Sequence, residues 1–181
     1  MKEKHIKLQN FNIGNSESFT LIAGPCVIES ENHAIEHAEQ IYEITKSLSL
    51  NFVFKSSFDK ANRTNINSKR GVGLEKGLAI LQKIKNRFKI PVTTDIHEVH
   101  HCEIAAKVID IIQIPAFLCR QTDLLIAAAR TNKIINVKKG QFLSPYEVPN
   151  IFKKIESTGN NRIMITERGT SFGYNNLVND F

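Results

Sequence analysis

Six short apolar runs recur along the chain, and most are nearly continuous instead of alternating with polar residues. They occupy residues 19–23, 52–54, 90–94, 109–114, 134–137 and 163–166. Most of their side chains are β-branched or aromatic, which is typical of strands covered on both faces. The pattern therefore predicts six buried β-strands.

Amphipathic or Leu- and Ala-rich segments lie between most of these runs and predict helices. Helical spacing of apolar residues is found over 33–48 and 74–88, and residues 122–130 are rich in Leu and Ala. A further helix is predicted to start with Ser144 as its N-cap, Pro145 in its first turn and Glu147 completing a capping box. Gly159 suits the end of that helix.

Alternating strands and helices predict a parallel α/β sheet. The runs begin about 29 residues apart on average, and an eight-fold (β/α)8 barrel at that spacing needs roughly 230 to 250 residues. The chain has 181 residues and holds six such units. An open six-stranded sheet and a barrel lacking its last quarter both fit. Residues 5–8 and 11–14 predict a small N-terminal hairpin, and residues 1–181 are expected to form a single domain.

Polar or charged residues follow five of the six runs. They are Lys55, Asp95, Gln113, Lys138 with Lys139, and Glu167 with Arg168. In parallel α/β folds the carboxyl ends of the strands share one edge, which carries the active site. Cations that converge there repel one another unless an anion is bound. The set therefore favours an anion-binding site over the ordinary polar ends of strands.

The loop after the second run adds more groups that bind phosphate. Lys60 and Arg63 supply cations, Asn62 an amide and Thr64 a hydroxyl. Arginine binds phosphate through two parallel hydrogen bonds, and lysine adds a point charge. Taken alone, the loop is equally well explained as a solvated turn. Together with the strand ends, it predicts a site for two phosphates and a carboxylate.

Two further features raise the question of metal binding. Cys26 follows the first run and is open to three interpretations: metal ligand, nucleophile or small buried residue, of which burial is favoured by the usual behaviour of cysteine. The segment from His97 to His101 matches the zinc-protease pattern HExxH, but its position directly after a strand favours a surface helix. Cys102 and Cys119 are expected to be packing residues.

Composition narrows the class of protein. The net charge is +6, and 41% of the residues are hydrophobic. There is no apolar run long enough to cross a membrane, no signal-peptide pattern, and no long basic block or aromatic RNA-binding motif. Three scattered cysteines do not form a disulfide framework. A cytoplasmic enzyme or binding protein that acts on small anionic molecules is expected, with no nucleic-acid or membrane partner.

Five segments resemble the 3-deoxy-D-manno-octulosonate 8-phosphate synthase family. They are residues 55–64 (KSSFDKANRT), 94–98 (TDIHE), 112–123 (IQIPAFLCRQTD), 136–142 (NVKKGQF) and 167–177. The resemblance runs from about residue 19 to Phe181. The segment KANR separates this family from the related heptulosonate 7-phosphate synthases, which usually read KPR there. Thr64 stands where the family usually has serine, and the hydroxyl is kept.

The resemblance implies a (β/α)8 barrel, a homotetramer, and condensation of phosphoenolpyruvate with arabinose 5-phosphate in lipopolysaccharide synthesis. It implies that phosphoenolpyruvate is bound by Lys60, Lys138, Arg168 and Gln113, with Lys55, Ser57 and Asp95 nearby. It implies that the sugar phosphate is held by Asn62, Arg63 and Thr64, and by Arg120 of a neighbouring subunit. Among these residues Lys60, Lys138 and Asp95 are the catalytic candidates, and Lys60 would protonate the aldehyde oxygen.

The resemblance also implies that Cys26 binds a divalent metal ion, zinc, iron or manganese, as in the metal-dependent class of the family. The remaining ligands are expected beyond Phe181. Two alternatives stay open. One is an incomplete barrel that binds phosphorylated ligands without turnover, and the other is the heptulosonate enzyme.

Overall fold

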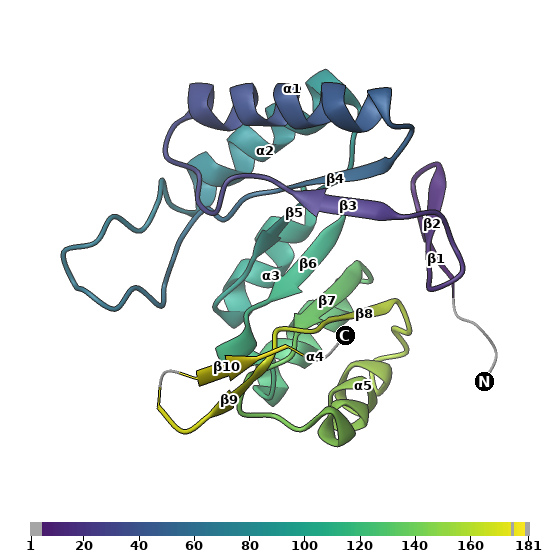
Figure 1. Ribbon diagram of the computed structural model, residues 1–181, viewed down its shortest axis with the longest axis vertical. Coiled ribbons are helices and arrows are strands. Elements are labelled where there is room, and N and C mark those ends of the chain that lie inside the picture. The colour runs from purple at the N-terminus through teal and green to yellow at the C-terminus, as the bar shows by residue number, and fades with distance from the viewer. Residues whose placement is uncertain (1–4, 175, 180–181) are drawn as a thin grey trace. The chain divides into compact units, whose positions relative to one another are not determined.

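The computed structural model describes residues 5–174 and 176–179 (Figure 1). The described chain forms two compact units. The first comprises the residues up to Asp95 together with Lys107–Asp110, and the second comprises Ile96–Ala106 and the residues from Ile111 onward. The expectation of a single domain stays a prediction.

The first unit contains a parallel sheet in the order β3 (Thr20–Ala23), β4 (Asn51–Lys55) and β5 (Val92–Asp95). Two helices, α1 (Glu31–Ser47) and α2 (Leu74–Phe88), pack against each other and against β4 and β5. The centre of β4 is buried, because its apolar side chains face the helices on one side and the sheet core on the other. Three of the six predicted strands are thereby confirmed as parallel strands.

Helix α2 contacts the segment after β4 through a glycine. A Cβ atom on Gly77 would lie 2.3 Å from the Cβ atom of Phe58, which is fully buried. Glycine inside a helix costs about 1 kcal/mol relative to alanine, so the close approach gives a reason for it here. The contact fixes the start of α2 beside the chain that leaves β4.

The predicted N-terminal hairpin is confirmed. Strands β1 (Ile6–Leu8) and β2 (Phe11–Ile13) pair antiparallel, with Ile6 opposite Ile13. The turn between them places Gln9 at a φ of 50°. Ile6 and Leu8 are buried, and the intervening residue of β1 is exposed, which is the alternation expected of a half-buried strand.

The second unit contains a parallel sheet in the order β6 (Ile111–Ile114), β7 (Ile134–Lys138) and β8 (Ile163–Thr166). Its helices are α3 (Val99–Ala106), α4 (Thr122–Arg130) and α5 (Val148–Glu156), with 3-10 turns at Ala116–Leu118 (η1) and Pro145–Glu147 (η2). Helix α4 packs against both α3 and α5. The coarse prediction of alternating strands and helices with parallel pairing is confirmed in both units.

The capping box predicted at Ser144 is wrong in part. The Ser144 hydroxyl accepts a hydrogen bond from the Tyr146 backbone N–H at 3.3 Å, as expected of a cap. The Glu147 carboxylate accepts from Asn150 at 3.1 Å instead of turning back to the cap. The segment forms a 3-10 turn first, so α5 begins only at Val148.

A second antiparallel hairpin, β9 (Thr170–Phe172) and β10 (Asn176–Val178), follows β8 and was not predicted. Phe172 pairs with Asn176, and Leu177 and Val178 are exposed. Its strands of three residues are too short to give a periodic signal. No helix within the described residues is both long and apolar enough to cross a membrane.

Candidate active site

Four of the predicted site residues meet in one cluster in the first unit. Lys55 ends β4, Asp95 ends β5, and Ser57 and Lys60 lie on the loop after β4. The Ser57 hydroxyl donates to Asp95 Oδ2 at 2.5 Å. Nζ of Lys55 and Nζ of Lys60 each donate to Ser57 Oγ at 3.0 Å. We call these four residues the lysine–aspartate cluster.

The cluster is shielded from solvent and carries a net positive charge. The side chains of Lys55, Lys60 and Asp95 are 14%, 15% and 6% exposed. The two ammonium nitrogens lie 3.4 and 3.7 Å from Asp95 Oδ2, so one carboxylate faces two cations. The surplus of one positive charge in a site with little water attracts an anion strongly.

Ser57 holds the lysine–aspartate cluster together. A hydroxyl has one hydrogen to donate and two lone pairs to accept. Ser57 donates to Asp95 and accepts from both Lys55 and Lys60, which uses all three capacities. The hydroxyl therefore has no capacity left for a ligand, and a bound anion would have to interact with the ammonium groups.

The chain after β3 runs beside this loop. The Ser56 hydroxyl donates to the Pro25 carbonyl at 2.8 Å, and the Ile28 N–H donates to the Ser57 carbonyl at 2.9 Å. At Gly24 a Cβ atom would lie 2.1 Å from the Lys55 carbonyl oxygen, so only glycine fits. Cys26 lies between Pro25 and Ile28 in the sequence, so these contacts hold its segment beside the one that carries Ser56 and Ser57.

The predicted sugar-phosphate residues lie on an exposed loop. Figure 1 shows this segment extending between β4 and α2, and Asn62, Arg63 and Thr64 are exposed. The base of the loop is closed by Asp59 and Arg70, which form a two-point ion pair. The Arg63 Nε donates to the Lys69 carbonyl at 3.3 Å. The loop is thus anchored at its base, and the three residues predicted to bind the sugar phosphate are exposed to solvent.

In the second unit, Gln113 belongs to a row of hydrogen-bonded polar side chains that crosses the sheet, of which Gln113 and Asn136 are buried. Asn136 on β7 donates to Gln113 Oε1 at 3.2 Å and accepts from the Thr166 hydroxyl at 2.8 Å. Gln113 pairs in register with Asn136, and Thr166 pairs with Lys138. Because side chains two residues apart share a face, Gln113, Asn136, Lys138 and Thr166 lie on one face of this sheet.

Lys139 was predicted, with Lys138, as a charged strand end of the anion-binding site, but it is a buried cation, 1% exposed. Its Nζ donates to three carbonyl oxygens, those of Gly140 at 3.2 Å, Leu143 at 3.1 Å and Gly169 at 3.1 Å. Glu167 Oε1 lies 3.5 Å from the same nitrogen. The three hydrogens of the ammonium group are therefore matched, and Lys139 ties the end of β7 to the segment after β8.

The remaining predicted residues of the second unit are exposed. Arg120 follows η1, and its carbonyl accepts from Lys154 Nζ at 2.7 Å. The two residues line a small pocket together with Leu143, Glu147, Asn150 and Ile151. Arg168 follows β8, where Glu167 Oε1 accepts from its N–H at 2.8 Å and from the Gly169 N–H at 2.6 Å. That turn directs the chain out of the sheet.

The three cysteines differ in exposure. Cys26 is exposed, so the interpretation of it as a buried packing residue is wrong. Cys102 and Cys119 are buried, as predicted. Burial raises the pKa of the Cys102 thiol from 9.0 to about 11, a hydrogen bond to the backbone opposing the shift. Cys102 is therefore a neutral thiol at physiological pH.

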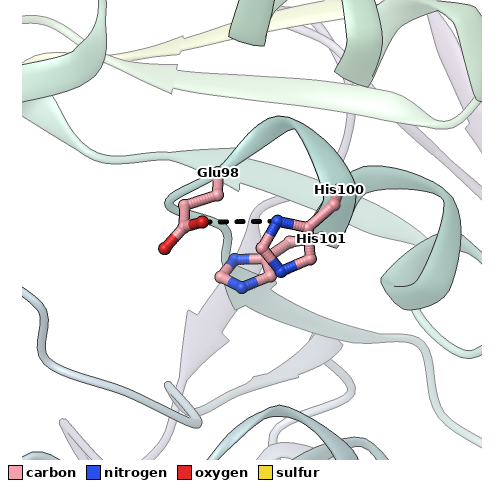
Figure 2. Close-up of side chains that lie close together, drawn as sticks. All are labelled: Glu98, His100 and His101. Atoms are coloured by element: carbon pink, nitrogen blue, oxygen red, sulfur yellow. Dashed lines mark ion pairs between the residues drawn. The ribbon is translucent and has the colours of Figure 1, made fainter.

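One group of potential metal ligands occurs within the described residues, and it does not include Cys26. It consists of Glu98, His100 and His101 at the start of α3 (Figure 2). Figure 2 shows the Glu98 carboxylate directed at the His100 ring, with the His101 ring beside it. The predicted helix is confirmed, but His97 precedes α3 and the group is not the His–Glu–His set of a zinc protease.

Sequence reasoning missed several residues of these sites. Asn136 and Thr166 lie inside predicted strands and were not proposed as site residues, although a polar residue within a buried strand is itself a signal. Lys139 was grouped with Lys138 as a charged strand end. The ion pair between Asp59 and Arg70 leaves no signal in the sequence, because it forms only when the loop closes.

Comparison with known proteins connects these features to a family. A profile of the DAHP synthetase I family matches residues 3–181. The chain belongs to this family. The match starts before residue 19, where the resemblance was expected to begin, and so includes the N-terminal hairpin.

Curated relatives of this member of the DAHP synthetase I family carry a more specific name. The 2-dehydro-3-deoxyphosphooctonate aldolase of Rickettsia prowazekii (strain Madrid E) is 58% identical over 178 residues. The protein of that name from Rickettsia typhi (strain ATCC VR-144 / Wilmington) is 57% identical over the same length. Both alignments cover 98% of this chain and 65% of the relative. The chain thus spans about two thirds of the length of these relatives.

Proposed function

We propose that the chain takes part in the synthesis of 3-deoxy-D-manno-octulosonate 8-phosphate from phosphoenolpyruvate and arabinose 5-phosphate. The lysine–aspartate cluster carries this proposal, since it offers a desolvated net positive charge to an anionic substrate. The names of the relatives support an eight-carbon product over the seven-carbon product of the heptulosonate enzyme. KANR at residues 60–63 supports the same choice.

In the proposed reaction the enol carbon of phosphoenolpyruvate forms a bond to the aldehyde carbon of the sugar. The aldehyde oxygen takes up a proton, and positive charge develops on the carbon that bears the phosphate ester. Water adds to that carbon and loses a proton, and the hemiketal phosphate then expels inorganic phosphate to leave the 2-oxo acid. The protein orients the two substrates and stabilises the developing charges.

The lysine–aspartate cluster would contribute to this reaction in two ways. Lys55 and Lys60 would bind the anionic groups of phosphoenolpyruvate, with Asp95 and Ser57 holding both ammonium groups in place. Lys60 would also supply the proton to the aldehyde oxygen, because it lies on the loop that continues into the proposed sugar-phosphate residues. Asp95 would keep the two cations from repelling each other before substrate arrives.

The residues of the second unit are proposed to bind substrate in the same reaction. Gln113, Lys138 and Arg168 would contact phosphoenolpyruvate, and the shared face of Gln113 and Lys138 supports this assignment. Arg120 would reach the sugar phosphate of a neighbouring subunit in a homotetramer. Arg120 is exposed, which supports a contact with a substrate bound to another subunit. A (β/α)8 barrel and a cytoplasmic location complete the proposal.

Cys26 is proposed as one ligand of a divalent metal ion, zinc, iron or manganese, that would polarise the aldehyde or the water. Its exposed thiol is accessible to an ion. One thiolate does not hold a catalytic metal alone, and the described residues offer no further ligands in a group with Cys26. The other ligands must come from outside the described set, so no step above depends on the metal.

A second function is favoured by one observation. The hydrogen bonds that join Ser57 to Lys55, Lys60 and Asp95 are made within one unit. The cluster could therefore bind phosphorylated ligands whether or not turnover occurs, as a binding protein would. Both functions predict that the cluster binds phosphoenolpyruvate, and only the synthase releases inorganic phosphate.

The substrate pair is tested by calorimetry and by product formation. The chain is saturated with phosphoenolpyruvate and titrated with arabinose 5-phosphate or erythrose 4-phosphate, and inorganic phosphate is measured afterwards. Tighter binding of arabinose 5-phosphate supports the octulosonate assignment. A preference for erythrose 4-phosphate would favour the heptulosonate enzyme, and binding without phosphate release would favour the binding protein.

A further inference from the structure

We propose that Glu98, His100 and His101 form a binding site for one divalent transition-metal ion at the start of α3. The site is separate from the one proposed at Cys26, and none of its residues is assigned to substrate. All three lie in the segment Ile96–Ala106, so the site is complete within one unit.

The distances fit an ion with a small adjustment of the side chains. One potential ligand atom from each residue lies within 4.8 Å of the other two. His100 Nδ1 and Glu98 Oε2 are 3.3 Å apart, and the rings of His100 and His101 have centroids 4.4 Å apart (Figure 2). Ligand atoms of a tetrahedral zinc site lie roughly 3.4 Å from one another, given bond lengths of about 2.1 Å. One pair already has that separation.

His101 is the buried member of the proposed site. Its Nδ1 accepts a hydrogen bond from the His97 backbone N–H at 3.3 Å. That bond places the ring proton of the neutral imidazole on Nε2. An ion on Nδ1 would replace the bond, and an ion on Nε2 would require the other tautomer. Because the bond is long, losing it costs little compared with a metal–nitrogen bond.

The ligand types select the class of metal. Imidazole nitrogen binds zinc, nickel, cobalt and copper in preference to magnesium and calcium, and one carboxylate is common in such sites. Glu98 and His100 have side chains 65% and 62% exposed, so water can occupy the remaining coordination positions. The N-terminus of a helix disfavours a cation, and the Glu98 carboxylate offsets that effect.

Metal binding here would have a structural consequence. Glu98 precedes α3, and His100 and His101 lie in its first turn. An ion bound to all three would fasten the chain after β5 to the start of a helix of eight residues. A ligand that binds only the folded state raises the free energy of unfolding. Above Kd, this increase grows with the logarithm of the ligand concentration.

The site is tested by equilibrium dialysis of the full chain with zinc chloride. The parent carries Cys26→Ser, so that the exposed thiol does not compete for zinc. A double variant adds Glu98→Gln and His100→Ala, both at exposed positions, and His100→Ala alone is also measured. The matched control adds His37→Ala, which removes a histidine from the other neighbouring pair, His33 and His37, whose ring centroids are 4.3 Å apart.

We expect one zinc ion per chain in the parent and in the His37→Ala control. Affinity should fall about tenfold or more in His100→Ala, and saturable binding should be lost in the double variant. Zinc should raise the thermal unfolding midpoint of the parent and the control but not that of the double variant. Unchanged binding in the double variant, loss of binding in the His37→Ala control, or no binding by the parent would each overturn the proposal. Circular dichroism without zinc confirms that every variant is folded.

Discussion

Ser57 donates its hydroxyl hydrogen to Asp95 Oδ2 at 2.5 Å, across 38 positions of sequence. The same oxygen of Ser57 accepts from Lys55 and Lys60. This hydroxyl is the point at which two strand ends and one loop are joined. The positions of both cations therefore depend on a residue that carries no charge.

Replacing Ser57 with alanine should loosen both lysines. The change removes the acceptor that the two ammonium groups share and the donor of the 2.5 Å bond to Asp95, in a site that excludes most water. We expect the free energy of unfolding to fall by about 1–3 kcal/mol, which urea denaturation measures. Ser68→Ala, at an exposed position of the same loop, is the control and should change stability little. Equal stability of the two variants would contradict the role given to Ser57.

Lys139 is expected to be a structural lysine. Lys139→Met keeps much of the side-chain volume but leaves three carbonyl oxygens without their donor. The loss of a buried cation with matched partners should lower the free energy of unfolding by about 3–5 kcal/mol. Lys153→Met on the exposed side of α5 is the matched control. If both variants unfold at the same urea concentration, Lys139 does not hold the segment after β8.

Alanine in place of Gly77 should destabilise the protein, although helices usually prefer alanine to glycine. Gly→Ala inside a helix ordinarily stabilises it by about 1 kcal/mol. Here the new methyl group would lie 2.3 Å from the Phe58 Cβ atom, so we expect Gly77→Ala to lower the thermal unfolding midpoint. Asn86→Ala, on the exposed side of the same helix, should leave it unchanged or raise it. A higher midpoint for Gly77→Ala would show that α2 does not pack closely on Phe58.

Cys102 should make stability fall in alkaline solution. Burial disfavours the thiolate and raises the pKa of the Cys102 thiol from 9.0 to about 11 in the folded chain. Below pH 9 both states carry a neutral thiol, and between pH 9 and 11 only the unfolded state ionises, so stability is lost as pH rises. The loss is on the order of 2–3 kcal/mol.

The difference between wild-type protein and Cys102→Ala isolates this effect. The cavity left by the substitution adds an offset that does not depend on pH, and other groups titrate in both proteins. We expect wild type to have a higher free energy of unfolding than Cys102→Ala in urea denaturation, and this difference should shrink from pH 8.5 to pH 11. A constant difference over that range would mean that the thiol is not buried.

Much of the fold could be predicted because strands and helices of this kind leave periodic signals. The six parallel strands, α1, α2 and α4 follow from apolar runs and amphipathic spacing. The hairpin β9–β10 could not be predicted, since strands of three residues with exposed side chains carry no period. The capping box at Glu147 failed because a 3-10 turn competes with an α-helix over so few residues.

Site residues could be brought together by prediction where they end neighbouring strands. Their positions could not be predicted where they depend on how a loop closes. Lys55 and Asp95 end neighbouring parallel strands, so their proximity follows from topology alone. Ser57 and Lys60 join them only because the loop after β4 turns back. Charge alone did not separate Lys138 from Lys139. β7 ends at Lys138, and the burial of Lys139 depends on the carbonyl oxygens that later segments bring to its Nζ.

The central claim is that the lysine–aspartate cluster binds phosphoenolpyruvate, and calorimetric titration of the chain with phosphoenolpyruvate tests it most directly. Three proteins are compared: wild type, Lys60→Ala, and Lys76→Ala, in which an exposed lysine of α2 undergoes the same change of charge. We predict that Lys60→Ala weakens binding by at least about tenfold, whereas Lys76→Ala binds like wild type. Equal affinities for Lys60→Ala and wild type, with both proteins folded, would contradict the claim.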